Sequence, residues 1–72
     1  MERHFDEEVK NLKQKLLAMA DTAQQMIGLS VKALTERDQK LTEEVFTLED
    51  RVNHAEIEIE DEVLRLLAIR QP

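Results

Sequence analysis

Four oxygen-bearing side chains in the last third of the chain have a spacing that could support chemistry. They follow one another at steps of four, three and four residues, which stacks them on one face of an α-helix. Carboxylates spaced by helical turns can ligate a hard or borderline cation. Any chemistry of this protein is therefore expected on these residues, called the acidic row below: Glu49, Asn53, Glu56 and Glu60.

An apolar stripe beside the acidic row predicts the helix that carries it, at about residues 39–70. The stripe has the helical period rather than the period of two that a strand would show. Residues 56–60 alternate between Glu and Ile in a strand-like way, but the helical stripe continues on both sides of them and decides the assignment. The stripe consists of Leu48, Val52, Ala55, Ile59, Val63 and Leu66.

Another apolar stripe predicts an earlier helix at about residues 4–36. Asp6, Glu7 and Glu8 stand where negative charge suits the positive end of the helix dipole. The spacing of this stripe is typical of a coiled-coil-like bundle, and its members are Phe5, Val9, Leu12, Leu16, Met19, Ala23, Met26, Ser30 and Ala33. An additional row widens the apolar face, so this helix is expected to touch more than one neighbour. The additional row consists of Leu17, Ala20, Ile27, Val31 and Leu34.

Residues 37–39 are the expected turn between the two helices. The segment TERDQK at residues 35–40 holds no core residue, and Asp38 suits the N-cap of the second helix. One uninterrupted helix through Arg37 is the alternative, because the segment contains neither Gly nor Pro. The hairpin is favoured because two long helices can bury their stripes on each other only if the chain reverses. The prediction is an all-α, antiparallel helical hairpin that forms a single domain over residues 1–72.

The composition limits the protein to one small helical domain that needs further support. A chain of 72 residues buries only a small fraction of its surface. There is no cysteine, which excludes disulfides and cysteine-based zinc sites. The remaining supports are association with other chains, an oxygen-ligated metal, or further polypeptide beyond this sequence.

The net charge of −6 lies entirely on the second helix. This acidity disfavours binding to nucleic acid or to an anionic membrane surface. No apolar run is long enough to span a bilayer, so a cytoplasmic protein is expected. Nine acids fall between Glu43 and Glu62, where Arg51 is the only base. Such a density of like charge destabilises a helix unless cations or a basic partner surface relieve it.

No catalytic set can be assembled from the sequence. It offers no grouping of Ser, His and acid and no nucleophilic cysteine, so a binding or regulatory protein is expected rather than an enzyme. His4 is interpreted as a local capping residue at the helix start, and His54 as a surface residue beside the acidic row.

Several segments resemble the PhoU family of phosphate-uptake regulators. The opening RHFDEE at residues 3–8, LLAM at 16–19 and AL at 33–34 are similar to family members in order and spacing. The ending carries most of the resemblance, with EIEI at 56–59 followed by LLAIRQP at 66–72. The resemblance covers the whole chain.

The resemblance implies an all-helical fold of three-helix bundles, with two similar repeats in a full-length member. This chain resembles the first two helices of the first repeat, so we expect dimerisation of two hairpins to complete a four-helix bundle. The function it implies is that of a cytoplasmic accessory regulator and protein-binding adaptor. Such a regulator contacts a phosphate transporter and a sensor kinase and restrains the phosphate-starvation response.

The resemblance also implies a metal site on the second helix. Family members carry an E/D-x-x-x-D motif there, associated with multinuclear sites that commonly hold iron or zinc. The matching positions are Glu49 and Asn53, and the amide of Asn53 supplies a neutral oxygen where the motif has a carboxylate. With Glu56 and Glu60 one and two turns further on, these four residues are the predicted ligands of an Fe or Zn ion.

Two other functions fit the same residues. In a structural dimerisation module without ligand, the acidic run at 56–62 is a solvated helix face and Asn53 fixes register as a polar seam residue. The other is a small metal-binding helical protein. A tight dimer indifferent to cations would indicate the first, and a melting temperature that rises with added metal would indicate the second.

Overall fold

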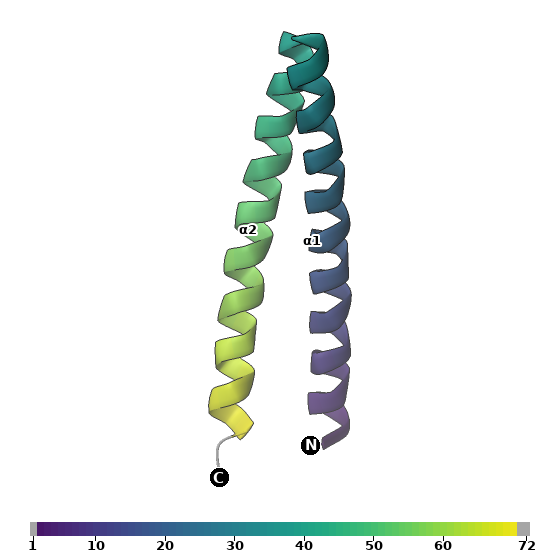
Figure 1. Ribbon diagram of the computed structural model, residues 1–72. Helices are drawn as coiled ribbons and strands as arrows, with labels where there is room; N and C mark the ends of the chain where they lie inside the picture. The colour runs from purple at the N-terminus through teal and green to yellow at the C-terminus, as the bar shows by residue number, and fades with distance from the viewer. Residues whose placement is uncertain (1, 71–72) are drawn as a thin grey trace.

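Two antiparallel helices make up the structure, a computed structural model that describes residues 2–70. Helix α1 spans Glu2–Glu36 and helix α2 spans Gln39–Arg70. They run alongside each other, so that the start of α1 and the end of α2 lie at one end of the molecule and the turn closes the other (Figure 1). The predicted helical hairpin is confirmed, and the alternative of one uninterrupted helix is wrong. No helix within the described residues is long and apolar enough to cross a membrane.

The turn is built by backbone and side-chain capping at residues 37 and 38. Arg37 has a φ of 52°, the left-handed conformation that commonly ends a helix. The amide of Asp38 then donates to the carbonyl of Ala33 at 3.3 Å, which satisfies one of the last carbonyls of α1. The carboxylate of Asp38 accepts hydrogen bonds from the amides of Lys40 at 2.9 Å and Leu41 at 3.3 Å. Asp38 is therefore the N-cap of α2, as the sequence predicts.

The two predicted stripes meet in the seam between the helices. In α2 every residue of the stripe is buried or half-buried, with Ile59 and Leu66 the deepest. In α1 the stripe is likewise buried or half-buried from Phe5 to Ala33, with one exception. Leu16 is 48% exposed, and within residues 2–70 no third element is present to cover it. The core is thus one narrow line of contacts.

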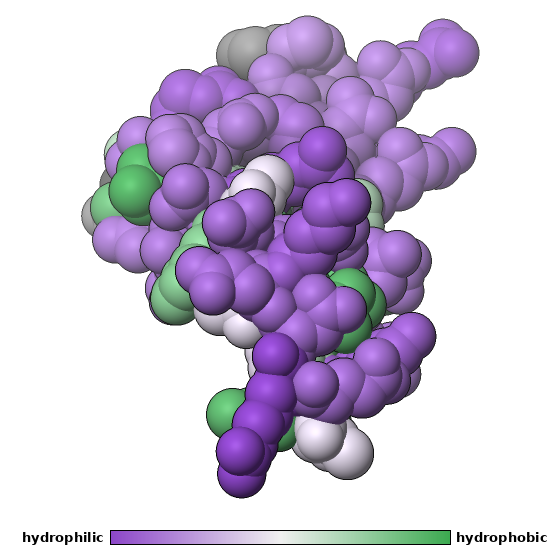
Figure 2. Space-filling model, turned by 90° about the horizontal axis from the view of Figure 1, so that it is seen from above, coloured by the Kyte–Doolittle hydropathy of each residue, from purple (hydrophilic) through white to green (hydrophobic). Residues whose placement is uncertain are grey.

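The additional apolar row of α1 has no covering element within residues 2–70. Leu17, Ile27, Val31 and Leu34 are all exposed, Leu34 to 79%. Viewed from the end of the molecule, apolar side chains emerge at several places in an otherwise hydrophilic surface (Figure 2). Helix α2 adds exposed apolar side chains at Phe46, Ile57, Leu64, Leu67 and Ile69. A pair of helices can bury only one stripe of each, so any second neighbour of α1 lies outside this hairpin.

We predict that Asp38→Ala lowers the free energy of unfolding by about 1 kcal/mol. The substitution leaves the amides of Lys40 and Leu41 without their side-chain acceptor at the start of α2. Asp38→Asn, the matched control, keeps an acceptor oxygen and should retain most of the stability. Urea unfolding followed by circular dichroism measures both variants, and equal stability of wild type and Asp38→Ala would contradict the capping role.

Candidate functional site

The acidic row lies on α2 beside the seam, and all four of its side chains are exposed. Glu49 and Glu60, its first and last members, are about 16 Å apart along the helix axis, too far to share one ion. Within residues 2–70, no group of three or more His, Cys, Asp or Glu side chains is arranged to hold a metal ion. The donors have suitable chemistry, but a cation bound here would complete its coordination from outside the hairpin. Glu49, Asn53, Glu56 and Glu60 therefore stay predicted ligands.

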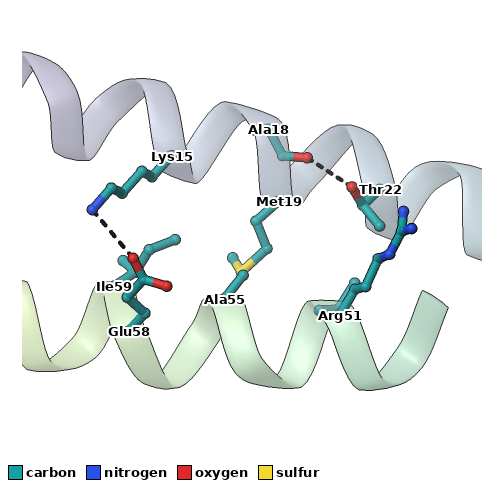
Figure 3. Close-up of a pocket in the computed structure, with 9 residues that line it drawn as sticks. Lys15, Ala18, Met19, Thr22, Arg51, Ala55, Glu58 and Ile59 are labelled. Carbon is teal, nitrogen blue, oxygen red and sulfur yellow. Dashed lines mark hydrogen bonds and ion pairs between the residues drawn. The ribbon is translucent and has the colours of Figure 1, made fainter. Parts of the chain in front are cut away.

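Ion pairs across the seam use acids of α2 that lie outside the acidic row. Lys15 Nζ lies 3.0 Å from Glu62 Oε2 and 3.3 Å from Glu58 Oε1, the second of which is drawn in Figure 3. Towards the open end of the hairpin, Arg65 Nη2 donates to Glu8 Oε2 at 2.9 Å. Sequence reasoning missed these pairs, because opposite charges beside the two stripes become partners only once the register of the helices is known.

A cation–π contact joins the two helices at the open end. The guanidinium carbon of Arg70 lies 4.7 Å from the centroid of the Phe5 ring. Contacts of this kind contribute about 0.5–1 kcal/mol at exposed sites. Arg70, the last described residue of α2, is thereby held against the first turns of α1.

A cavity of about 290 Å³ lies between the helices near the middle of the hairpin (Figure 3). Met19 of α1 and Ala55 of α2 line it from the two sides, and Lys15 and Arg51 are the cationic residues of its lining. The small side chains of Ala18 and Ala55 leave this space open. Because Lys15 is already held by two carboxylates, the cavity is a packing gap of the seam rather than a built ligand site.

The cross-seam ion pairs shift the pKa of two side chains in opposite directions. The hydrogen bond from Arg65 lowers the pKa of the Glu8 carboxyl below its ordinary value. Hydrogen bonds to Glu62 and to Glu58 raise the pKa of the Lys15 ammonium. The Glu8 contribution to stability is present above the ordinary glutamate value and is lost as pH falls through the lowered pKa. The Lys15 contribution is present below the ordinary lysine value and is lost as pH rises through the raised pKa.

Neither histidine contributes to the acidic row. His54 is exposed, and its Nδ1 donates to the carbonyl oxygen of Asp50 at 2.7 Å, one turn earlier on α2. His4 Nε2 lies 2.9 Å from Glu8 Oε1 within the first turns of α1. His54 is a surface residue, as interpreted from the sequence, whereas His4 contacts the side chain of Glu8 and, within residues 2–70, makes no capping contact with the backbone.

Comparison with known protein families gives a match to the PhoU domain over residues 16–72. The chain belongs to the PhoU domain family. It is 33% identical over 70 residues to a phosphate-specific transport system accessory protein PhoU homolog of Pseudomonas aeruginosa, which covers 97% of this chain and 29% of that protein. The identity is 35% over 68 residues to the PhoU homolog of Rhizobium meliloti, covering 94% of this chain and 29% of that protein. No solved structure matches the chain.

The PhoU hairpin spans under a third of the length of these relatives. The domain match begins at residue 16, so it includes the acidic row and most of the seam but not the Glu8 and Phe5 contacts at the open end. The ending LLAIRQP, which carried most of the resemblance, falls inside the match, although Gln71 and Pro72 lie outside the described residues. The PhoU resemblance inferred from the sequence is confirmed.

We predict that Glu8→Gln weakens the hairpin at neutral pH and reduces its sensitivity to acid. Because Arg65 lowers the pKa of Glu8 below the ordinary value of 4.5, the wild-type chain loses this part of its stability as pH falls through that lowered pKa. The variant lacks the titrating carboxyl, so its unfolding free energy should fall less on acidification. Urea unfolding at stepwise lower pH measures the difference.

Glu7→Gln is the matched control for this prediction. It makes the same charge change one residue away, where the ion pair of the carboxylate within residues 2–70 is with Arg3 of its own helix, at 4.0 Å. It should therefore cost less stability at neutral pH than Glu8→Gln. Equal losses in the two variants would show that the contact with Arg65 does not stabilise the hairpin.

Proposed function

We propose that this PhoU hairpin serves as an accessory regulator of phosphate uptake and of the phosphate-starvation response. The observation that supports the proposal is the PhoU domain match over residues 16–72. Relatives that align with nearly the whole chain are named accessory proteins of the phosphate-specific transport system. Because the hairpin spans under a third of those proteins, it accounts for one contact surface of such a regulator.

The proposed mode of action is protein binding in the cytoplasm, without catalysis. The partners are components of a phosphate transporter and its sensor kinase. The hairpin exposes apolar residues of both helices next to acidic residues of α2. Exposed apolar side chains beside one sign of charge are typical of protein interaction sites.

The role can be tested in Pseudomonas aeruginosa that lacks its PhoU homolog and carries a phosphate-starvation reporter. Expression of the chain should lower reporter output in phosphate-rich medium. Ile59→Asp, which places a carboxylate at a 9% exposed seam position and should unfold the hairpin, is the control and should not lower it. An unchanged reporter, with the wild-type chain shown by immunoblot to be present, would overturn the proposal.

We further propose that the acidic row binds a divalent cation such as Fe or Zn. The support is the charge pattern of α2: Lys15 relieves Glu58 and Glu62, whereas within residues 2–70 no cation lies within 4.0 Å of a carboxylate of the acidic row. Carboxylates spaced by one helical turn repel each other, and a bound cation reverses that cost.

A thermal melt with chelator and then with Fe(II), Zn(II) or Mn(II) tests cation binding. A ligand that binds only the folded state raises the melting temperature by mass action, so a rise of several degrees is expected. Glu49→Gln should reduce the rise, whereas Glu43→Gln, the same change outside the acidic row, should not. The absence of a shift with every cation would refute the metal proposal and leave the phosphate role standing.

We also propose that the hairpin self-associates into a four-helix bundle. The exposed apolar rows described above favour this assembly, and they equally support the second candidate function, a structural dimerisation module. The two candidates differ in the reporter experiment, since a module that only holds chains together would leave the phosphate-starvation reporter unchanged.

A further inference from the structure

The hairpin exposes more surface than a compact chain of its mass. Its accessible surface is 6109 Å², whereas a compact monomer of 8.4 kDa exposes about 4,600 Å². The excess of roughly 1,500 Å² is larger than the 800 Å² or so that each partner buries in a standard interface. The surface therefore has room for one more partner of substantial size.

The two flanks of the hairpin differ in chemistry. One flank, called the paired flank, is closed by the ion pairs of Glu8 with Arg65 and of Lys15 with Glu58 and Glu62. These polar contacts pair five charged side chains, so this flank presents a polar edge. Ile27 and Leu34 of the additional apolar row are exposed and take no part in these ion pairs, so we consider the other side as the surface for a partner.

The opposite flank, called the open flank, contains two rows with a seven-residue period. A cavity of about 250 Å³ lined by Leu34 of α1 and Thr42 of α2 marks this flank near the turn. Steps of seven keep residues on one line of a helix that packs in a bundle. From Leu34 the line on α1 runs back through Ile27 and Ala20 to Lys13. From Thr42 the line on α2 runs forward through Glu49 and Glu56 to Val63, with Glu60 one turn beyond Glu56.

The two lines complement each other in charge. The α1 line is apolar from Leu34 to Ala20, carries a base at Lys13, and ends one step of seven further at the acid Asp6. The α2 line carries the exposed carboxylates of Glu49 and Glu56, which have no ion-pair partner within residues 2–70, and it ends at the base Arg70. Away from the open end, a second copy of the same chain therefore offers an apolar stretch with Lys13 to the acidic stretch of α2.

The register of the hairpin fixes where these lines would meet. Lys15 reaches both Glu58 and Glu62, so residue 15 of α1 lies level with about residue 60 of α2. A two-fold rotation about an axis parallel to the helices does not change the height of any residue along that axis. Lys13 of one copy then lies within about 3 Å, along the axis, of the level of Glu60 of the other.

The alternative two-fold axis, perpendicular to the helices, is disfavoured by like charges. It would place α2 of one copy against α2 of the other, with the acidic rows facing each other near Glu56. Carboxylates directly opposed in this way repel. The parallel axis instead sets each acidic α2 between two α1 helices, one from its own chain and one from the other.

We propose that the open flank is the surface on which a second copy packs, with both turns at the same end and α1 of each chain over α2 of the other. Lys13 of each copy pairs with Glu60 of the other copy. This inference rests on the self-association proposed above and is independent of the role in phosphate regulation.

Charge-reversal variants in sedimentation equilibrium test the proposed surface. Lys13→Glu and Glu60→Lys should each raise the dissociation constant about tenfold, because a two-fold dimer contains each pair twice. The double variant, which restores opposite charges, should recover most of the wild-type affinity. Lys32→Glu, the same change away from the open flank, is the control and should leave the dissociation constant within about twofold of wild type.

Disulfide trapping tests the orientation, since the chain has no cysteine of its own. A mixture of Lys13→Cys and Glu60→Cys chains should form the mixed disulfide on oxidation. Glu56→Cys alone should form little disulfide dimer, whereas the perpendicular axis would make it the better cross-linker.

The outcomes separate this inference from the other proposals. A wild-type chain that stays monomeric at high micromolar concentration overturns both self-association and the proposed surface. A dimer whose dissociation constant is unchanged by Lys13→Glu and Glu60→Lys, or that cross-links through Glu56→Cys, overturns the proposed surface but not self-association. Neither result bears on the phosphate-starvation reporter, which tests the regulatory role separately.

Discussion

The single seam between α1 and α2 is the contact on which the rest of the structure depends. Two helices touch along only one line. Among the described residues, the buried hydrophobic residues on this line are Ala33, Ile59 and Leu66. Such a seam provides limited hydrophobic stabilisation for a chain of this length. The two-residue turn and the polar contacts at the edge of the seam are consistent with one register, in which the two apolar stripes meet.

The acidic charge of α2 serves two separate purposes. Glu58 and Glu62 are used within the hairpin, where Lys15 joins both of them and fixes the level of α1 against α2. Glu49, Glu56 and Glu60 face outwards and make no ion pair within residues 2–70. The net charge of −6 does not distinguish between these acids. Their position relative to the seam decides which of them are available to a partner or a cation.

The sequence predicts the helices, the turn and the seam because each depends on local information. Periodicity identifies the buried stripes, and Asp38 has the side chain that an N-cap requires. The left-handed conformation of Arg37 could not be predicted in this way, because that position usually holds Gly. The ion pairs of Lys15 and Arg65 depend on the register between distant segments. Leu16 is exposed although it keeps the period, since burial at the edge of a seam depends on an element that the hairpin lacks.

The acidic row shows the same limit of sequence reasoning for a site. Spacing along one helix predicts which oxygens share a face, and the four residues do share one in the structure. Spacing does not predict whether a second element brings further donors to the same point, and within residues 2–70 none does. A coordination site requires donors that surround an ion, whereas one helix offers donors only along a line.

Self-association and cation binding would use the same part of α2. A second copy on the open flank brings Lys13 to Glu60, which places an ammonium group where a divalent cation would otherwise bind. The two events are therefore linked, and the linkage is reciprocal: whatever a cation does to the dissociation constant of the dimer, dimerisation does to the affinity for the cation. A second copy and a cation would therefore compete for the same carboxylates of α2.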